Sequence, residues 1–253
     1  MNILITGVTS GFGLAMAKTL HHAGHTIIGT GRRMARLTAL QDELGERFIP
    51  LCFDIAKQDE LDKALASLPS DVLANIEVLI NNAGLALGLE TADKANLDDW
   101  HTMINTNITG LVQMTRAVLP QMVAKDSGLI INIGSTAGNH PYSGANVYGA
   151  SKAFVKQFSL NLRADLLGKN VRVTNLEPGM CGDTEFSNVR FKGDDDKVAG
   201  VYANVDYITP QDIANTVAWI ISQPPHININ RLEIMPTAQT FAGLTVARKT
   251  NNK

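Results

Sequence analysis

The stretch Asn2-Ile3-Leu4-Ile5-Thr6-Gly7-Val8-Thr9-Ser10-Gly11-Phe12-Gly13 sets a short apolar run directly before a glycine-rich turn. The run predicts a strand over 2–6, and the turn opens a helix that we expect over 12–23. Glycines at such a turn permit a tight bend and a close approach of the backbone to a pyrophosphate. A turn of this kind can be purely structural, but its place in a βαβ unit favours a nucleotide site. The candidate cofactor contacts in it are Gly7, Thr9, Ser10, Gly11, Phe12 and Gly13.

Apolar runs alternate with longer helical stretches along the whole chain. Further strands are expected over 26–30, 47–53, 76–80, 128–133, 171–176 and 231–235, and a long helix over 97–123. This alternation predicts an α/β fold with a seven-stranded parallel sheet and helices on both faces. Right-handed crossovers make it a single doubly wound Rossmann-type domain over 1–253. The exception is the polar segment 179–207, whose length predicts a substrate loop.

The composition limits the classes of protein to which the chain can belong. With 253 residues, 45% of them hydrophobic and 18% charged, the chain suits one domain with a large core rather than a disordered chain. A net charge of −2 without a Lys- or Arg-rich block argues against nucleic acid or a membrane surface as the main partner. Cys52 and Cys181 show no metal or redox spacing, and the sequence has no signal-peptide pattern. We therefore expect a reduced, cytoplasmic setting.

A candidate acid–base pair is formed by Tyr148 and Lys152, which are one helical turn apart. Ser135 lies thirteen positions upstream, at the end of an apolar run. An unperturbed tyrosine has a pKa of about 10, and a cation one turn away favours the phenolate and lowers that pKa. A nearby hydroxyl can hold the oxygen of a reacting carbonyl or alcohol. An isolated pair could merely line an exposed helix face, but the other motifs favour the catalytic interpretation.

The residues at the end of the second predicted strand indicate which nicotinamide cofactor the protein prefers. Gly31 stands where an acidic residue would hold the ribose 2′-hydroxyl of NAD, and Arg32 and Arg33 follow it. Guanidinium groups match a 2′-phosphate bidentately. A solvated pair of arginines at a helix start is the alternative, but the missing carboxylate favours NADP(H).

Turn residues follow two further strands. Asn81, Ala83 and Gly84 come at the end of the fourth strand, and Pro178 and Gly179 follow the sixth, where the chain would pass a bound cofactor. Side-chain amides beside a central strand can fix the backbone around a cofactor. Asparagine and glycine are also ordinary turn residues, so alone these motifs are weak signals.

Taken in this order, the motifs resemble those of the short-chain dehydrogenase/reductase superfamily over nearly the whole chain. More narrowly, the sequence is similar to the bacterial NADP-dependent 3-hydroxy acid dehydrogenases, also described as L-allo-threonine or serine dehydrogenases and malonic semialdehyde reductases. The narrower resemblance is carried by 81–89 (NNAGLALGL), 132–138 (NIGSTAG) and 184–194 (TEFSNVRFKGD). The last run is the most specific, because it lies in the predicted substrate loop.

The resemblance implies a catalytic tetrad of Asn107, Ser135, Tyr148 and Lys152. Ser135 would hold the substrate oxygen, and Tyr148 would take or give the hydroxyl proton. Lys152 would lower the tyrosine pKa and hold the nicotinamide ribose, while Asn107 would support a water-linked proton route. Hydride would pass between NADP(H) and the 3-carbon of a small 3-hydroxy or 3-oxo acid.

The resemblance also implies further cofactor contacts and an assembly. Asp54 and Ile55 would flank the adenine, and residues 177–185, including Thr184, would wrap the nicotinamide end. Members of the family form homotetramers, which leads us to expect a homotetramer here.

The carboxylate of such a substrate would need a cation, because an unpaired buried charge is costly. The segment 179–207 offers Arg190 and Lys192. We predict that Arg190 binds the substrate together with Ser135 and Tyr148, since a planar fork can bind both carboxylate oxygens. That both cations are solvated loop charges is an equal alternative.

Two other functions stay open at this point. A 3-oxoacyl-carrier-protein reductase or general carbonyl reductase would need a wide entrance and a basic docking surface. A non-catalytic NADP-sensing regulator would have no need of a proton donor, so intact Ser135, Tyr148 and Lys152 argue against it.

The sequence predicts no metal site. His21, His22 and His25 fall at a helix end without carboxylate or cysteine support. The consecutive acids 194–196 do not have a spacing that suits one calcium ion. Trp219 lies among apolar residues and is expected in the core.

Overall fold

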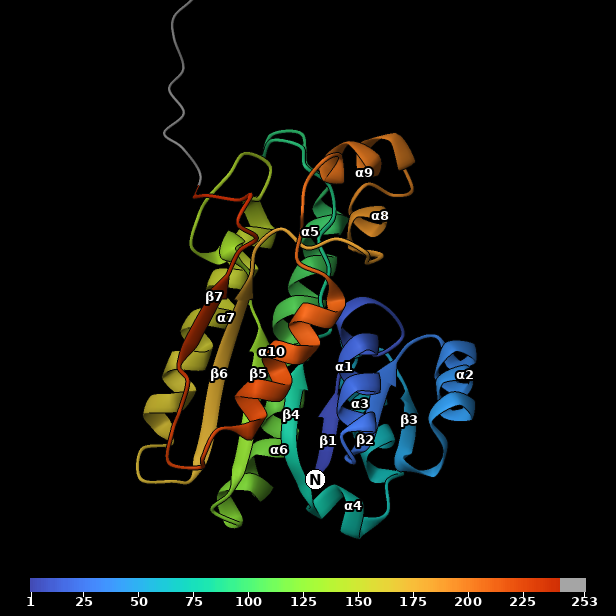
Figure 1. Cartoon of the computed structure of the whole chain (residues 1–253), viewed down its shortest axis with the longest axis vertical. Coiled ribbons are helices and arrows are strands. Elements are labelled where there is room, and N and C mark those ends of the chain that lie inside the picture. The colour runs from blue at the N-terminus through green and yellow to red at the C-terminus, as the bar shows by residue number, and fades with distance from the viewer. Residues whose placement is uncertain (242–253) are drawn as a thin grey trace, which may run out of the picture.

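One parallel sheet organises the chain. The computed structural model describes residues 1–241, and its seven strands are hydrogen-bonded in the order β3-β2-β1-β4-β5-β6-β7 (Figure 1). Every neighbouring pair of strands in it is parallel. The strands are β1 (Asn2–Ile5), β2 (Thr26–Gly31), β3 (Phe48–Cys52), β4 (Ile76–Asn81), β5 (Gly128–Ile133), β6 (Val171–Pro178) and β7 (Arg231–Ile234).

Helices cover both faces of this sheet, and each face has its own core. Ile3 and Ile5 of β1 pack with side chains of α1, α2 and α10, whereas Leu4 packs with side chains of α3, α6 and α7. Successive side chains of a strand point to opposite faces, so a strand buried on both faces is apolar throughout. The helices are α1 (Gly11–His22), α2 (Met34–Leu44), α3 (Gln58–Ala66), α4 (Ser70–Ala74), α5 (Leu97–Ile104), α6 (Leu111–Ala124), α7 (Asn146–Asp165), α8 (Phe186–Arg190), α9 (Asp195–Tyr202) and α10 (Pro210–Ser222).

The strand order reverses at β1, which has β2 on one side and β4 on the other. In doubly wound sheets, ligands bind outside the carboxyl ends of the strands at such a switch point. The predicted seven-stranded, doubly wound α/β fold is confirmed. None of the helices within residues 1–241 is long and apolar enough to cross a membrane.

Two predicted segments differ from the structure in detail. The helix expected over 97–123 consists of α5 and α6 joined by a π-helical turn, Asn105–Gly110. π-Helical turns are rare in proteins, and those that occur often lie near functional sites. The segment 179–207, expected as a loop, contains the short helices α8 and α9. Asp194 caps α9 by accepting a hydrogen bond from the Lys197 amide.

The expectation for Trp219 is wrong. This residue is 49% exposed, whereas its neighbours Val217 and Ile220 are buried. Residues of a helix advance by about 100° each, so the face that contains Ile213, Val217 and Ile220 turns toward the sheet while position 219 points outward. An apolar neighbourhood in the sequence does not by itself place a helical residue in the core.

His21 is buried near the end of α1, and neither of its ring nitrogens has a hydrogen-bond partner among the described residues. Burial, together with the charges of Arg47 and His22, lowers the pKa of His21 from its ordinary value of 6.5. The unfolded chain therefore binds a proton at this residue more readily than the folded protein does. Stability is accordingly lost as the pH falls below about 6.5.

We expect the substitution His21→Leu to weaken this acid sensitivity. The substitution removes the titrating group and places an apolar side chain in the core. The measurement is the free energy of unfolding in urea at about pH 7.5 and about pH 5.5, on either side of the histidine pKa. His101→Leu, at an exposed position of α5, is the matched control and should keep the acid sensitivity, because its charge is not among those that lower the His21 pKa. An unchanged pH dependence in His21→Leu would contradict this explanation.

Candidate functional site

A pocket of about 590 Å³ lies at the carboxyl ends of the strands. Most of the residues predicted to bind cofactor or substrate line it. They are Gly7, Thr9, Ser10, Gly11, Phe12, Arg32, Arg33, Asp54, Ile55, Ala83, Gly84, Ser135, Tyr148, Lys152, Pro178, Gly179, Thr184 and Arg190. Three predicted residues, Gly13, Asn81 and Asn107, lie outside the pocket lining.

The glycine turn after β1 allows a close approach of the backbone. Gly7 has φ +76° and Gly11 has φ +53°, which is the left-handed region that favours glycine. A Cβ on Gly13 would collide with the Gly7 carbonyl oxygen, so Gly13 serves the packing of α1 rather than ligand contact. Within the described chain, Ser10 makes no capping hydrogen bond and the first turn of α1 has no acidic side chain. Its backbone N–H groups are therefore available to an anion.

The arginines that follow β2 differ in their contacts. Arg33 donates from Nε and Nη2 to Thr9 Oγ1, at 3.1 and 2.7 Å, and from Nη1 to Glu185 at 2.8 Å. Arg36 donates to the same carboxylate at 2.6 Å. Arg32 lines the pocket and forms no hydrogen bond or ion pair with any residue in 1–241. Arg32 is thus the guanidinium that is available for a 2′-phosphate.

Asn82 lines the pocket, although the sequence analysis selected its neighbour Asn81. Asn82 Nδ2 donates to the carbonyl oxygens of Thr6 and Gly7, at 2.8 and 3.2 Å, and so joins β4 to the glycine turn. Asn81 is buried instead, and its Nδ2 donates to Asn132 Oδ1 at 2.8 Å. Adjacent residues of an extended chain point in opposite directions, and the doubled asparagine alone does not show which one faces the ligand.

Asn107 is buried in the π-helical turn, and its hydrogen bonds join the segment that follows β4 to α7. Its Oδ1 accepts a hydrogen bond from the Leu85 amide at 2.9 Å, and its Nδ2 donates to the Leu85 carbonyl at 2.8 Å. Nδ2 also donates to Ser151 Oγ at 3.1 Å, and Ser151 donates to the Tyr148 carbonyl at 2.7 Å. Asn107 therefore links two walls of the pocket, and its implied part in a proton route stays a prediction.

Helix α7 brings Tyr148 and Lys152 into the pocket on one face. They are 8% and 7% exposed, so the alternative of an exposed helix face does not hold. Lys152 Nζ lies 5.9 Å from the centroid of the Tyr148 ring and donates to the Ile133 carbonyl at 2.8 Å. Ser135 lies in the same pocket at the end of β5, and its Oγ accepts a hydrogen bond from the Ala137 amide at 3.1 Å.

Burial dominates the acid–base properties of this pair. Desolvation raises the pKa of Tyr148 to about 12, while hydrogen bonding with Ser135 and the charge of Arg190 act in the opposite direction. Desolvation also lowers the pKa of Lys152 to about 8. The expected lowering of the tyrosine pKa by Lys152 is not seen: the groups that lower this pKa are Ser135 and Arg190, and burial outweighs them. Tyr148 holds its proton at neutral pH and becomes an acceptor only when another group stabilises the phenolate.

Arg190 lies on α8 and also reaches the Tyr148 ring. Its Cζ lies 5.6 Å from the ring centroids of both Tyr142 and Tyr148, and its Nε donates to the Gly88 carbonyl at 3.2 Å. Its second terminal nitrogen, Nη2, is buried and has no hydrogen-bond partner in the part of the chain that the structure describes. A buried nitrogen of this kind is costly, and an anion bound there would remove the cost.

Other contacts hold the segment 179–207 over the pocket, and no sequence pattern indicated them. Lys192 pairs with Asp99 at 2.8 Å, outside the pocket lining. Within the segment, the hydroxyls of Tyr202 and Ser187 are hydrogen-bonded at 2.5 Å and join α8 to α9. Pocket residues that the sequence analysis missed include Tyr142, Phe186, Val189, Val201, Tyr202 and Gln239.

A doubly wound sheet, a glycine turn at its switch point and a buried Tyr–Lys pair on one helix face define a class of oxidoreductases. The family model described as short chain dehydrogenase matches residues 1–195. The chain belongs to the short-chain dehydrogenase family.

Particular relatives narrow the comparison. A probable NADP-dependent dehydrogenase of Haemophilus influenzae is 58% identical over 246 residues, which are 97% of each chain. The NADP-dependent 3-hydroxy acid dehydrogenase YdfG of Salmonella typhi is 56% identical over 248 residues, 98% of this chain and 100% of the relative. A solved structure described as the closed form of serine dehydrogenase complexed with NADP+ matches with a TM-score of 0.96 and 55% identity, covering 98% of this chain and 100% of that one.

The different contacts of Arg32 and Arg33 predict different effects on cofactor binding. Arg32→Ala should weaken NADPH binding by about 10- to 100-fold, as expected for a hydrogen bond to a charged group worth about 1.5–3 kcal/mol, and should leave NADH binding nearly unchanged. Arg33→Ala should weaken the binding of both cofactors, because Arg33 also holds Thr9 and Glu185. Fluorescence titration of each variant measures the two affinities. Equal losses for NADPH and NADH in Arg32→Ala would show that the 2′-phosphate binds elsewhere.

Proposed function

We propose that this protein is an NADP-dependent dehydrogenase that transfers a hydride between NADP(H) and the 3-carbon of small 3-hydroxy or 3-oxo acids. The observation that supports this substrate class best is Arg190. Its Cζ lies 5.6 Å from the Tyr148 ring centroid, and its buried Nη2 has no hydrogen-bond partner among the described residues. A cation for a carboxylate is thereby next to the group that would move the proton. Substrates of this class include 3-hydroxypropionate or malonic semialdehyde, L-serine and L-allo-threonine.

The residues of the pocket fit NADP(H). The free N–H groups at the start of α1 suit the pyrophosphate, and Arg32 suits the 2′-phosphate. Gly31 leaves no carboxylate at the end of β2 to repel that phosphate. Asp54 and Ile55 would border the adenine, and the wall from Pro178 to Thr184 would border the nicotinamide. When bound, NADP(H) supplies or accepts the hydride.

The protein's own groups would manage the proton. In the reducing direction, Ser135 holds the carbonyl oxygen and Tyr148 donates its proton to that oxygen. A high pKa keeps Tyr148 protonated at neutral pH, which suits this direction. In the oxidising direction, Tyr148 must first become a phenolate, which nearby positive charge favours. Lys152, held by the Ile133 carbonyl, retains further N–H groups for the nicotinamide ribose.

Arg190 would hold the substrate carboxylate. Its Nε is fixed by Gly88 and its ring neighbours Tyr142 and Tyr148 flank the guanidinium, so the orientation is set before a ligand binds. A fixed guanidinium fork can bind both oxygens of a carboxylate. Lys192, the other candidate cation, is committed to Asp99.

The alternative functions have less support. The acyl thioester of a 3-oxoacyl-carrier-protein carries no carboxylate for Arg190 to bind. A regulator that only senses NADP has no need of Tyr148 as a proton donor. The homotetramer implied by the family resemblance, the cytoplasmic location and the extent of the single domain stay predictions.

The proposed function is tested by NADPH oxidation with malonic semialdehyde, beside NADP+ reduction with L-serine, L-allo-threonine and uncharged alcohols of similar length. We expect the acids to be turned over with the higher kcat/KM, because only they engage Arg190. A preference for uncharged carbonyl compounds or for long acyl thioesters would overturn the proposal.

Removing the phenol should abolish assisted proton transfer. Tyr148→Phe should lower kcat by more than the ~10²–10⁴-fold credited to general acid–base catalysis, because alkoxide formation is then unassisted. NADPH affinity should be nearly intact, whereas Lys152→Ala should lower both turnover and cofactor affinity. Steady-state kinetics and NADPH titration separate these effects. Near-native turnover of Tyr148→Phe would show that another group moves the proton.

Removing the guanidinium should raise KM for acids far more than for uncharged substrates. Arg190→Ala should raise KM for L-serine and malonic semialdehyde by about 10- to 100-fold, the effect of a lost charge-assisted hydrogen bond, and should change KM for uncharged aldehydes little. Lys192→Ala is the matched control, because this cation lies on the same segment but pairs with Asp99. If Arg190→Ala lowers activity on charged and uncharged substrates equally, the carboxylate is held elsewhere.

A further inference from the structure

A buried carboxylate at the end of β6 has no part in the chemistry described so far. Glu177 was expected near the nicotinamide, but it does not line the pocket and is 1% exposed. Its side chain lies on the same face of β6 as Val171 and Val173, which pack in the core beneath α7. Polar side chains thus replace apolar ones as this face approaches the pocket.

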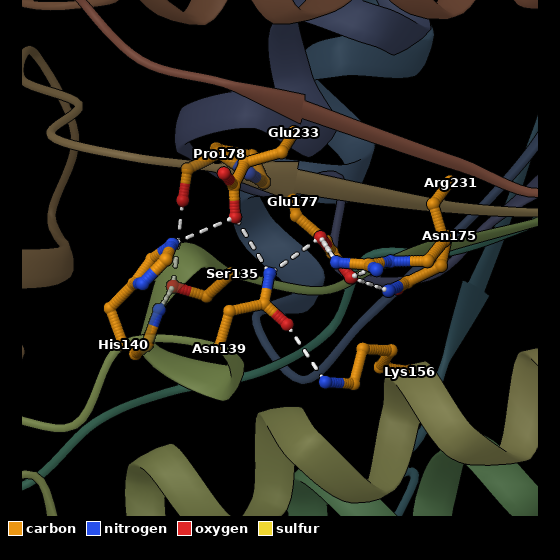
Figure 2. Close-up of polar contacts among 10 residues, drawn as sticks. Ser135, Asn139, His140, Lys156, Asn175, Glu177, Pro178, Arg231 and Glu233 are labelled. Carbon is orange, nitrogen blue, oxygen red and sulfur yellow. Dashed lines mark hydrogen bonds and ion pairs between the residues drawn. The ribbon is translucent and has the colours of Figure 1, made fainter. Parts of the chain in front are cut away.

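Both oxygens of Glu177 are saturated by donors from three segments, as Figure 2 shows. Arg231 of β7 donates from Nε to one oxygen at 3.1 Å and from Nη2 to the other at 2.7 Å. Asn175 adds a hydrogen bond to the first oxygen at 2.5 Å, and Asn139 adds one to the second at 2.8 Å. A buried carboxylate is tolerated only with such pairing, so its contacts form one fixed unit.

Asn139 connects Glu177 and its donors to the turn that begins at Ser135. It directly follows the 3-10 turn Thr136–Gly138, which Ser135 begins. Its Nδ2 reaches Glu233 of β7 at 2.7 Å as well as Glu177, and its Oδ1 accepts a hydrogen bond from Lys156 of α7 at 2.8 Å (Figure 2). The end of the turn that begins at Ser135 is therefore joined to β6, to β7 and to helix α7.

Besides its hydrogen bonding with Tyr148, the Ser135 hydroxyl is held by one long and one ordinary hydrogen bond. Oγ donates to the Pro178 carbonyl at 3.5 Å and accepts from the Ala137 amide at 3.1 Å. Pro178 is the next residue after Glu177 in the chain. Glu177 is therefore connected to Ser135 in two ways, through Pro178, the next residue in the chain, and through Asn139 at the end of the turn.

We propose that Asn139 and Glu177 are positioning residues that set the Ser135 hydroxyl relative to Tyr148. The inference depends on the proposed function only in taking Ser135 as the group that holds the substrate oxygen. A displacement of about 1 Å at a reacting centre can lower turnover by about 10²-fold. Hydrogen bonding with Ser135 also opposes the rise in the Tyr148 pKa, so a displaced serine would let that pKa rise further.

The first test is Asn139→Ala. We expect kcat to fall by about 10- to 100-fold, while the Kd for NADPH stays within about twofold, because the cofactor contacts remain. The pH profile of kcat/KM for the oxidation should move to higher pH. Asn161→Ala removes an exposed amide from the same helix, α7, and is the matched control, with unchanged kcat and pH profile.

The second test is Glu177→Gln, which keeps the size of the side chain and removes its charge. Arg231 keeps 42% of its side chain exposed, so its charge stays hydrated in this variant and the chain should fold. We expect the same direction of change in kcat and in the pH profile. The double variant should be no slower than the slower single variant, because two residues that act through one network give non-additive effects.

Several outcomes would overturn the proposal. Both single variants could keep kcat and the pH profile within about twofold, or NADPH affinity could fall in step with kcat, or the double variant could show additive losses. In Asn139→Ala and Glu177→Gln, kcat should fall by the same factor for acids and for uncharged aldehydes, since Ser135 would hold the oxygen of either. If the unmodified protein does not act on 3-hydroxy acids, the proposed function fails, but the positioning role is still measured on whichever carbonyl compound it reduces.

Discussion

Burial of ionisable groups on one face of α7 is the constraint on which the site depends. Tyr148 and Lys152 lie one turn apart and are both buried, and Tyr148 packs with Ala86 and Met103. In that environment the neutral form of each group is favoured, which raises the tyrosine pKa and lowers the lysine pKa. Charges interact more strongly where water is excluded, so the protonation of this pair responds to any charged ligand that enters the pocket.

The segment 179–207 joins the two ends of the pocket into one enclosure. Glu185 binds Arg33 at the end where the 2′-phosphate would lie, and Lys192 binds Asp99 beyond the substrate end. Both ion pairs are partly exposed, so each is screened by water and contributes only modestly to holding the segment in place. The same segment would therefore cover both the cofactor and the substrate. Its contact with Arg33 would lie near the cofactor, and its contact with Asp99 would lie near the substrate.

Local patterns in the sequence predicted those parts of the site that local geometry dictates. The glycine turn and the spacing of Tyr148 and Lys152 each specify a conformation within one or two turns of chain. Contacts between distant segments had no such signal. That Arg33 is committed to Glu185, and that Glu177 turns away from the pocket to bind Arg231, depends on residues more than fifty positions away.

The proton affinity of Tyr148 tests this account most directly. It is measured from the ultraviolet absorbance of tyrosinate during a pH titration, as the difference between the unmodified protein and Tyr148→Phe, with and without NADP+. Without NADP+, we predict that Tyr148 keeps its proton well beyond the ordinary tyrosine pKa of about 10. With NADP+, its pKa should fall, because the oxidised nicotinamide carries a positive charge. Ionisation of Tyr148 below about pH 10 in the free protein, or an identical pKa in both states, would contradict the account.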